Sequence, residues 1–198
     1  MRLKKFLLAL ITLLFVTTQV SAAQAPVRIA VLPIIFRSAQ PDANTCAELE
    51  VKIARATHIP LNDTLKVAEY IPPAQSTKVL SEIWRQMRAA DKKAKIQNAM
   101  RPLAEDLDAD IIVCPILLSY NQNYTGAFTA SDTYISSQVR AELIVYDRRT
   151  DNLVDKKFSR MYHDMISTFG TADFLAKECF DRLIDETKLR QTIFAIRK

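Results

Sequence analysis

Two histidines and three cysteines are the residues of this 198-residue chain best suited to catalysis or metal binding. His163 and Asp164 form the only adjacent pair of a histidine and a carboxylate, and His58 lies 105 positions earlier. A hydrolytic metal centre needs three or more converging ligands. Two separated histidines do not supply such a set. The sequence therefore predicts no metal site, no cofactor and no catalytic residue.

The cysteines offer little nucleophilic chemistry, because no known catalytic signature surrounds any of them. Cys114 lies inside an apolar strand pattern, which predicts a packed core residue. Cys46 and Cys179 both fall on predicted helices, so a disulfide between them is possible. An odd number of cysteines in an exported protein permits one disulfide and one free thiol, or three buried thiols.

Aromatic residues in the polar segment 119–134 are the first candidates for binding a partner. Tyr120, Tyr124 and Phe128 recur at a spacing of four in a predicted long loop or extended hairpin tip. Their rings would provide rigid contact area at low entropic cost, as protein interfaces often do. The alternative is that these rings fold back onto the sheet.

A second candidate is a ligand site at the carboxyl ends of the predicted parallel strands. Open α/β sheets place ligands in the crevice outside these ends. Arg37, Asp42 and Cys114 are the residues expected near its mouth. This site would serve a small-ligand binder or a hydrolase.

The N-terminus has the three zones of a cleavable signal peptide over residues 1–22. A basic start containing Arg2 precedes the apolar run 6–16, and small residues end at Ala22. Cleavage before Ala23 leaves residues 23–198 as one domain. Residues 18–25 contain no cysteine that could carry a lipid. We expect an unlipidated protein in the periplasm, or secreted, with no transmembrane segment after cleavage.

Composition argues against two kinds of partner. The whole chain has two glycines, too few for the glycine-rich loops that bind nucleotides. It carries 27 Lys and Arg against 22 Asp and Glu, but three of these cations belong to the signal peptide. The mature balance is 24 against 22, or about +2, which gives no support for nucleic-acid binding.

Hydrophobic periodicity predicts a mixed α/β domain with three layers, in the order β-α-β-α-β-β-β-α. Continuous apolar runs at 27–35 and 111–118 indicate strands buried on both faces. Alternation in 135–145 and the turn 147–152 predict a C-terminal antiparallel hairpin. The remaining expected elements are a helix over 45–57 capped by Asn44 or Thr45, a strand over 65–71, helices over 76–90 and 96–107 with Pro102 kinking or restarting the second, a returning strand over 153–165, and a last helix capped by Thr171.

Three short stretches carry a resemblance to a known family of envelope domains. They are Ile29–Pro33 (IAVLP), Leu107–Val113 (LDADIIV) and Ala141–Asp147 (AELIVYD). Together with the element order, they resemble the α/β domain of the curli secretion channel (CsgG-like), the N-terminal domain of the Tol-system propeller protein and the outer-membrane activators of penicillin-binding proteins. Asp108, Cys114 and the pair 151–152 replace glycines usual in those families.

The resemblance implies a non-enzymatic cell-envelope protein. We expect an adaptor or assembly factor that binds another envelope protein through a sheet edge or through segment 119–134. A homo-oligomer is also possible. The small-ligand binder or hydrolase is the alternative.

Overall fold

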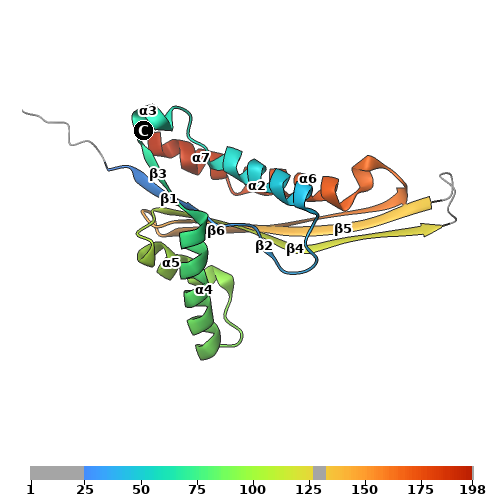
Figure 1. Ribbon diagram of the computed structural model, residues 1–198, viewed down its shortest axis with the longest axis horizontal. Coiled ribbons are helices and arrows are strands. Elements are labelled where there is room, and N and C mark those ends of the chain that lie inside the picture. Colours follow the sequence, from blue (N-terminus) through green and yellow to red (C-terminus); the bar gives the residue numbers. More distant parts are fainter. Residues whose placement is uncertain (1–24, 127–132, 198) are drawn as a thin grey trace, which may run out of the picture.

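The computed structural model describes residues 25–126 and 133–197. The predicted signal peptide and Phe128 lie outside these residues. The described chain folds around one six-stranded sheet with the order β3-β1-β4-β5-β6, in which β2 also pairs with β4 (Figure 1). The strands are β1 (Val27–Val31), β2 (Ile35–Phe36), β3 (Ala68–Ile71), β4 (Ile111–Gly126), β5 (Thr133–Asp147) and β6 (Asn152–Met165).

The sheet is mixed, as predicted. β1 pairs in parallel with β3 and with β4, whereas β4, β5 and β6 form antiparallel pairs. The predicted C-terminal hairpin is therefore confirmed. Its turn holds Asp151 at a φ of 49°, and Asp108 before β4 has a φ of 48°. Both are aspartates, which tolerate this left-handed geometry better than most residues.

Helices cover both faces of the parallel part of the sheet, giving the three layers expected (Figure 1). On one face lie α2 (Ala43–Thr57), α6 (Ala172–Glu186) and α7 (Leu189–Phe194). On the other lie α4 (Pro73–Ala90), the 3₁₀ turn η1 (Ile96–Ala99) and α5 (Met100–Asp106). Each face of the sheet has its own hydrophobic core, and successive strand residues point into different cores. Ile29 packs in the core under α2 and α6, and Ala30 packs in the core under α4 and α5. No helix in the described part of the chain is long and apolar enough to cross a membrane.

Several boundaries differ from the prediction for local reasons. The strand expected over 27–35 is divided, because Pro33 lacks the N–H that a ladder needs. The cap of α2 is Asp42 rather than Asn44 or Thr45, since its Oδ1 accepts hydrogen bonds from both of their backbone N–H groups at 2.8 and 3.0 Å. The first residues of the strand expected over 65–71 belong instead to α3 (Asn62–Leu65) and its end.

Two prolines and a threonine cap explain where the helices α4, α5 and α6 begin. α4 begins at Pro73, earlier than predicted, because proline at the first helical position gives up no hydrogen bond. Pro102 lies in the first turn of α5, so the helical run restarts there rather than kinking. Thr171 caps α6 as expected, accepting a hydrogen bond from the N–H of Phe174 at 3.3 Å.

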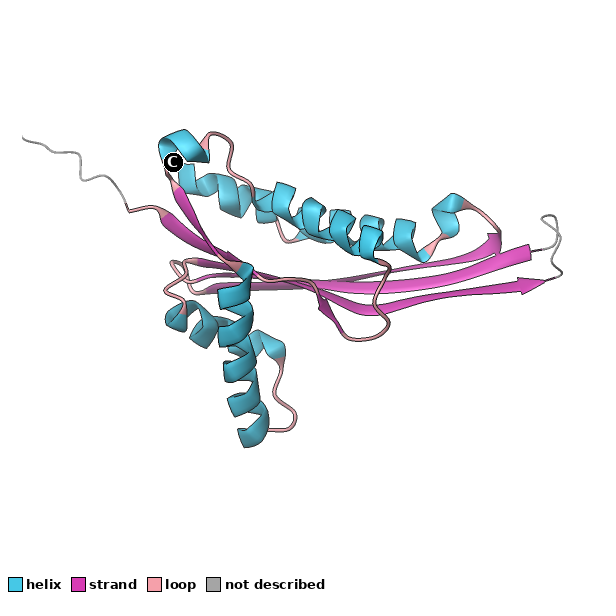
Figure 2. Cartoon of the chain, in the orientation of Figure 1, coloured by secondary structure: helices cyan, strands magenta, loops and turns pink. Residues whose placement is uncertain are grey.

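The largest difference is the length of the antiparallel strands. β4 continues to Gly126, through segment 119–126 that was expected to be a loop or hairpin tip, after a register shift between Leu117 and Ser119. Residues 119–126, 133–140 and 159–165 form a three-stranded ribbon, here called the extension, that reaches beyond the helices α4 and α5 (Figure 2). α6 lies along one of its faces.

Candidate binding sites

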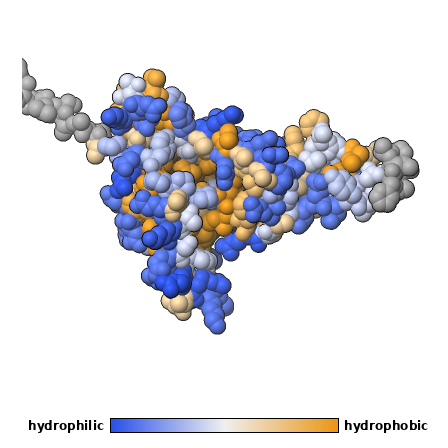
Figure 3. Space-filling view, in the orientation of Figure 1, coloured by the Kyte–Doolittle hydropathy of each residue, from blue (hydrophilic) through white to orange (hydrophobic). Residues whose placement is uncertain are grey.

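An apolar pocket of about 360 Å³ lies at the carboxyl ends of β1 and β3. α2 lies on one face of the sheet and α4 on the other, and the pocket lies between them where the two parallel strands end. Figure 3 shows hydrophobic side chains gathered on the surface between these two helices. The lining is mostly aliphatic and includes Ile29, Val31, Leu32, Pro33, Ile34, Ile53, Ala54, Ile71, Pro73 and Pro115.

The pocket has few polar groups available to a ligand. The hydroxyl of Tyr70 is already used, donating to the Thr57 carbonyl at 2.8 Å and accepting from the N–H of Ile59 at 3.1 Å. Burial raises the pKa of Tyr70. Besides Tyr70, the exposed polar residues of the lining are Glu50 and His58. This arrangement suits binding of an apolar group, because it lacks an assembled acid, base and nucleophile.

A second, polar cavity of about 520 Å³ lies on the α4 side of the sheet. At its floor the amide of Gln97 donates to Glu142 Oε1 at 2.7 Å and to Asp155 Oδ2 at 2.8 Å. Lys157 Nζ lies 3.5 Å from Glu142 Oε1 and 3.8 Å from Asp155 Oδ2. Glu142 is 4% exposed. Burial and then the neighbouring Asp155 raise the pKa of Glu142.

The raised pKa predicts how stability depends on pH. An acid whose pKa is higher in the folded state binds more protons when folded, so stability falls as pH rises from the unfolded value near 4.3 through the folded value. Glu142→Gln should remove this loss. As pH rises from 4 to 7, the free energy of unfolding of the variant should therefore increase relative to that of the wild type. Urea unfolding at each pH measures this difference. Glu105→Gln, an exposed change of the same charge on α5, gives the baseline, and a difference independent of pH would contradict the prediction.

The three residues expected at the ligand site, Arg37, Asp42 and Cys114, do not converge. Arg37 reaches the polar cavity, where its guanidinium lies 5.9 Å from the centre of the Trp84 ring. Asp42 caps α2. Cys114 is fully buried in the core under α4 and α5, and burial raises its pKa to about 12. The pocket at the strand ends is real, but other residues line it.

The aromatic candidates also divide. The hydroxyl of Tyr120 hydrogen-bonds the carboxylate of Asp173 on α6, and the ring packs against the core. Tyr120 therefore folds back onto the sheet, which was the alternative prediction for these rings. Burial raises the pKa of Tyr120, and the neighbouring carboxylate of Asp173 raises it further. Tyr124 is 55% exposed, and its hydroxyl accepts a hydrogen bond from Gln122 at 2.6 Å. Phe128 lies outside the described residues.

The opposite side of the extension carries a surface that sequence reasoning missed. Register places Tyr134 beside Met165 and Gln138 beside Met161, all pointing away from α6. Tyr134 is 45%, Met161 74% and Met165 49% exposed. No described helix lies against this surface, here called the open face (Figure 1). Its residues are Asn121, Asn123, Thr125, Tyr134, Ser136, Gln138, Met161, His163 and Met165.

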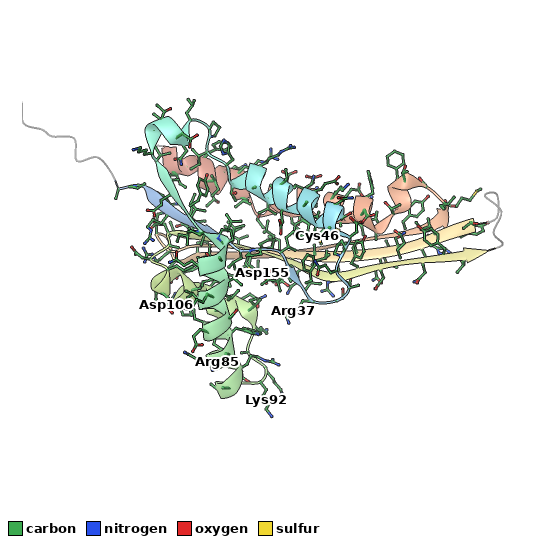
Figure 4. The ribbon with its side chains drawn as sticks, viewed as in Figure 1. Arg37, Cys46, Arg85, Lys92, Asp106 and Asp155 are labelled. Atoms are coloured by element: carbon green, nitrogen blue, oxygen red, sulfur yellow. The ribbon has the colours of Figure 1, made fainter. Side chains whose placement is uncertain are left out.

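The thiols and histidines form no further centre. Cys46 and Cys179 are free thiols, so the disulfide considered between them is not present. The Sγ of Cys179 is buried against the Val139 carbonyl, whereas Cys46, labelled in Figure 4, contacts the loop before its own helix. Among the described residues, no group of three or more His, Cys, Asp or Glu side chains could hold a metal ion.

No protein-family model matches the chain, and no curated protein matches it either. Solved structures give remote similarities. Lipoprotein GNA1162 from Neisseria meningitidis is 16% identical with a TM-score of 0.41, over 81% of this chain and 99% of that one. The hypothetical protein CT253 from Chlamydia trachomatis is 14% identical with a TM-score of 0.44, over 85% and 99%. The LpoB C-terminal domain from Salmonella enterica is 12% identical with a TM-score of 0.30, over 75% and 89%. The resemblance to CsgG-like domains stays a prediction.

Proposed function

We propose that this chain is an exported, non-enzymatic adaptor or assembly factor of the cell envelope that binds another protein through the open face. The observation that carries the proposal is the grouping of Tyr134, Met161 and Met165, each 45% exposed or more, on a ribbon that projects beyond α4 and α5. Exposed apolar side chains that gather on one surface mark interaction sites more often than scattered ones do.

The chemistry of the open face fits a protein partner. Methionine adapts its shape to a partner surface, and tyrosine combines apolar area with a hydroxyl. The surrounding Asn, Ser, Thr and Gln side chains can form the polar, hydrated rim of an interface. A rigid ribbon held from behind by α6 also loses little conformational entropy on binding.

Strand β6 adds a second contact surface, because it is one of the two outer strands in the sheet order and is 14 residues long. Such an edge can accept an extended segment of a partner as an additional strand. Lys156 and Asp164 are exposed on it, and charges of this kind discourage unspecific pairing between edges. A partner strand with charges of opposite sign at the facing positions would pair with this edge better than an apolar strand would.

A photo-crosslinking residue at Met161 tests the proposal in the source cells. We expect a discrete crosslinked product, since this side chain is central and 74% exposed on the open face. The same residue placed at Arg85, exposed on α4, is the matched control and should give no such product. A crosslink between two copies of the chain would identify the partner as a homo-oligomer.

Charge introduced next to the crosslinker provides the second arm of this test. Tyr134→Glu with Met165→Lys should abolish the product while leaving stability within about 0.5 kcal/mol per change, because both positions are exposed and the two new charges, which face each other across β5 and β6, have opposite sign. Equal products at Met161 and Arg85, or a product that survives both charges, would show that the open face is not the contact surface.

The apolar pocket favours a second candidate function, the binding of a small ligand. Its position at the ends of β1 and β3 is where open α/β sheets hold ligands. The hydrolase form of this candidate has less support. A hydrolase would need a nucleophile beside a base such as His58, and the neighbouring hydroxyl on α2 is that of Thr57. This hydroxyl already donates to the carbonyls of Ile53 and Ala54, both at 3.1 Å.

The proposed location is outside the cytoplasmic membrane, in the periplasm or secreted. It rests on the signal-peptide pattern of residues 1–22, and the mature chain would begin at Ala23 without a lipid. An adaptor of the envelope must reach that compartment to meet its partner.

A further inference from the structure

We propose that the apolar pocket binds a small amphipathic cation, with an alkyl or aromatic body in the pocket and an ammonium or guanidinium group at Glu50. This inference names a ligand class for the second candidate function. It is independent of the open face, which lies on a different part of the molecule.

The pocket wall formed by α2 has a polar end and an apolar middle. Glu50, Ile53, Ala54 and Thr57 line the pocket at spacings of three and four residues, so they share one helical face. Ile53 is buried, whereas Ala54 and Glu50 are exposed. A ligand lying along this face would cover aliphatic surface first and meet a carboxylate at its end. A volume of about 360 Å³ lies within the range of small-molecule sites.

Glu50 differs from its nearest charged neighbours on α2, Glu48 and Lys52. Glu48 is paired with Lys177, and Lys52 with Asp181 at 2.6 Å. Within the described part of the chain, no ion pair or hydrogen bond engages the Glu50 side chain. Its charge is thus available to a ligand at the rim. The carboxyl end of α2, at Thr57 about two turns from Glu50, adds partial negative charge at the other end of the same wall.

An anionic ligand has less to bind. Among the described helices, α4 is the one that begins at the pocket, and its first residue, Pro73, has no N–H. The N–H groups of Gln75 and Ser76 already donate to the Pro72 carbonyl, at 3.0 and 3.2 Å. A carboxylate or phosphate in the pocket would also face Glu50. Apart from His58, Glu50 is the one residue of the lining that can carry a full charge at neutral pH, so the lining favours a cation over a fatty acid of the same length.

Three probes with one chain length separate these ligands: octylamine, 1-octanol and octanoate. Their dissociation constants from the mature protein, residues 23–198, can be measured by titration calorimetry below the concentrations at which the probes form micelles. We expect the order octylamine, then octanol, then octanoate, from tightest to weakest. Octanoate binding as tightly as octylamine, or no probe binding at all, would overturn the proposal.

Variants of α2 connect binding to the pocket. Ala54→Trp should weaken octylamine and octanol by about tenfold or more, which corresponds to excluding roughly two methylene groups. Ala47→Trp, exposed on the same helix but outside this pocket, should change neither. Glu50→Gln should weaken octylamine about two- to fivefold, as for an exposed ion pair, and leave octanol unchanged. Unchanged octylamine binding in Ala54→Trp or in Glu50→Gln contradicts the assignment, and neither result bears on crosslinking at Met161.

Discussion

Phe180→Ala should lower the free energy of unfolding by about 3 to 5 kcal/mol, the usual cost of removing a fully buried ring. Phe180 is 0% exposed on α6, in the core that this helix forms with the sheet. Packing around it is continuous, so the vacated volume cannot be refilled without moving the helix or a strand. Urea unfolding of the mature protein, with circular dichroism as the signal, measures the change.

Phe169→Ala is the matched control for this prediction. Phe169 is 65% exposed and makes an edge-on contact with Phe174, with ring centres 5.1 Å apart and planes at 87°. Loss of one such aromatic pair costs about 0.5 to 1.5 kcal/mol. Equal destabilisation by the two variants would mean that α6 does not pack on the sheet as described. Because α6 also supports the back of the extension, Phe180→Ala should weaken partner binding along with stability.

Apolar periodicity was sufficient to predict the fold class. Continuous or alternating apolar residues indicated the strands, and apolar residues three and four positions apart indicated the helices. Val27–Val31 is apolar except for Arg28 and becomes a parallel strand between two helix layers. Residues 119–126 show why the sequence left a long loop open as an alternative to the extended hairpin that the structure has. Asn121, Asn123 and Gly126 belong to residue types that are depleted in strands. Pairing with β5 holds this segment extended, and Tyr120 and Gln122 also bond residues of α6.

The candidate sites were harder to predict than the fold. The pocket gathers residues from Ile29 to Pro115, and nothing in their sequence separates its lining from ordinary core. Arg37 follows β2 and Cys114 lies within the neighbouring β4, yet Arg37 reaches a surface cavity and Cys114 is buried in the core. The open face left a trace that could have been found. Met161, His163 and Met165 alternate along β6, and their exposure followed once β5 was known to be buried on one side only.

Leu7→Arg combined with Leu8→Arg should retain the full-length precursor inside the cell. Each arginine at the centre of an apolar translocating segment costs about 2.5 to 3.5 kcal/mol, and both residues belong to the apolar run 6–16. Fractionation followed by immunoblotting measures the exported share. Leu8→Ile keeps the segment apolar and should leave export unchanged.

The mass of the wild-type protein from its native cells tests the same prediction from the product side. The proposed cleavage between Ala22 and Ala23 would yield residues 23–198 with no added group, because residues 18–25 contain no cysteine to acylate. A retained Met1, or a mass increment equal to a fatty acid, would contradict the proposed processing. An adaptor that remained in the cytoplasm could not meet an envelope partner, so either result would also remove the compartment on which the proposed function depends.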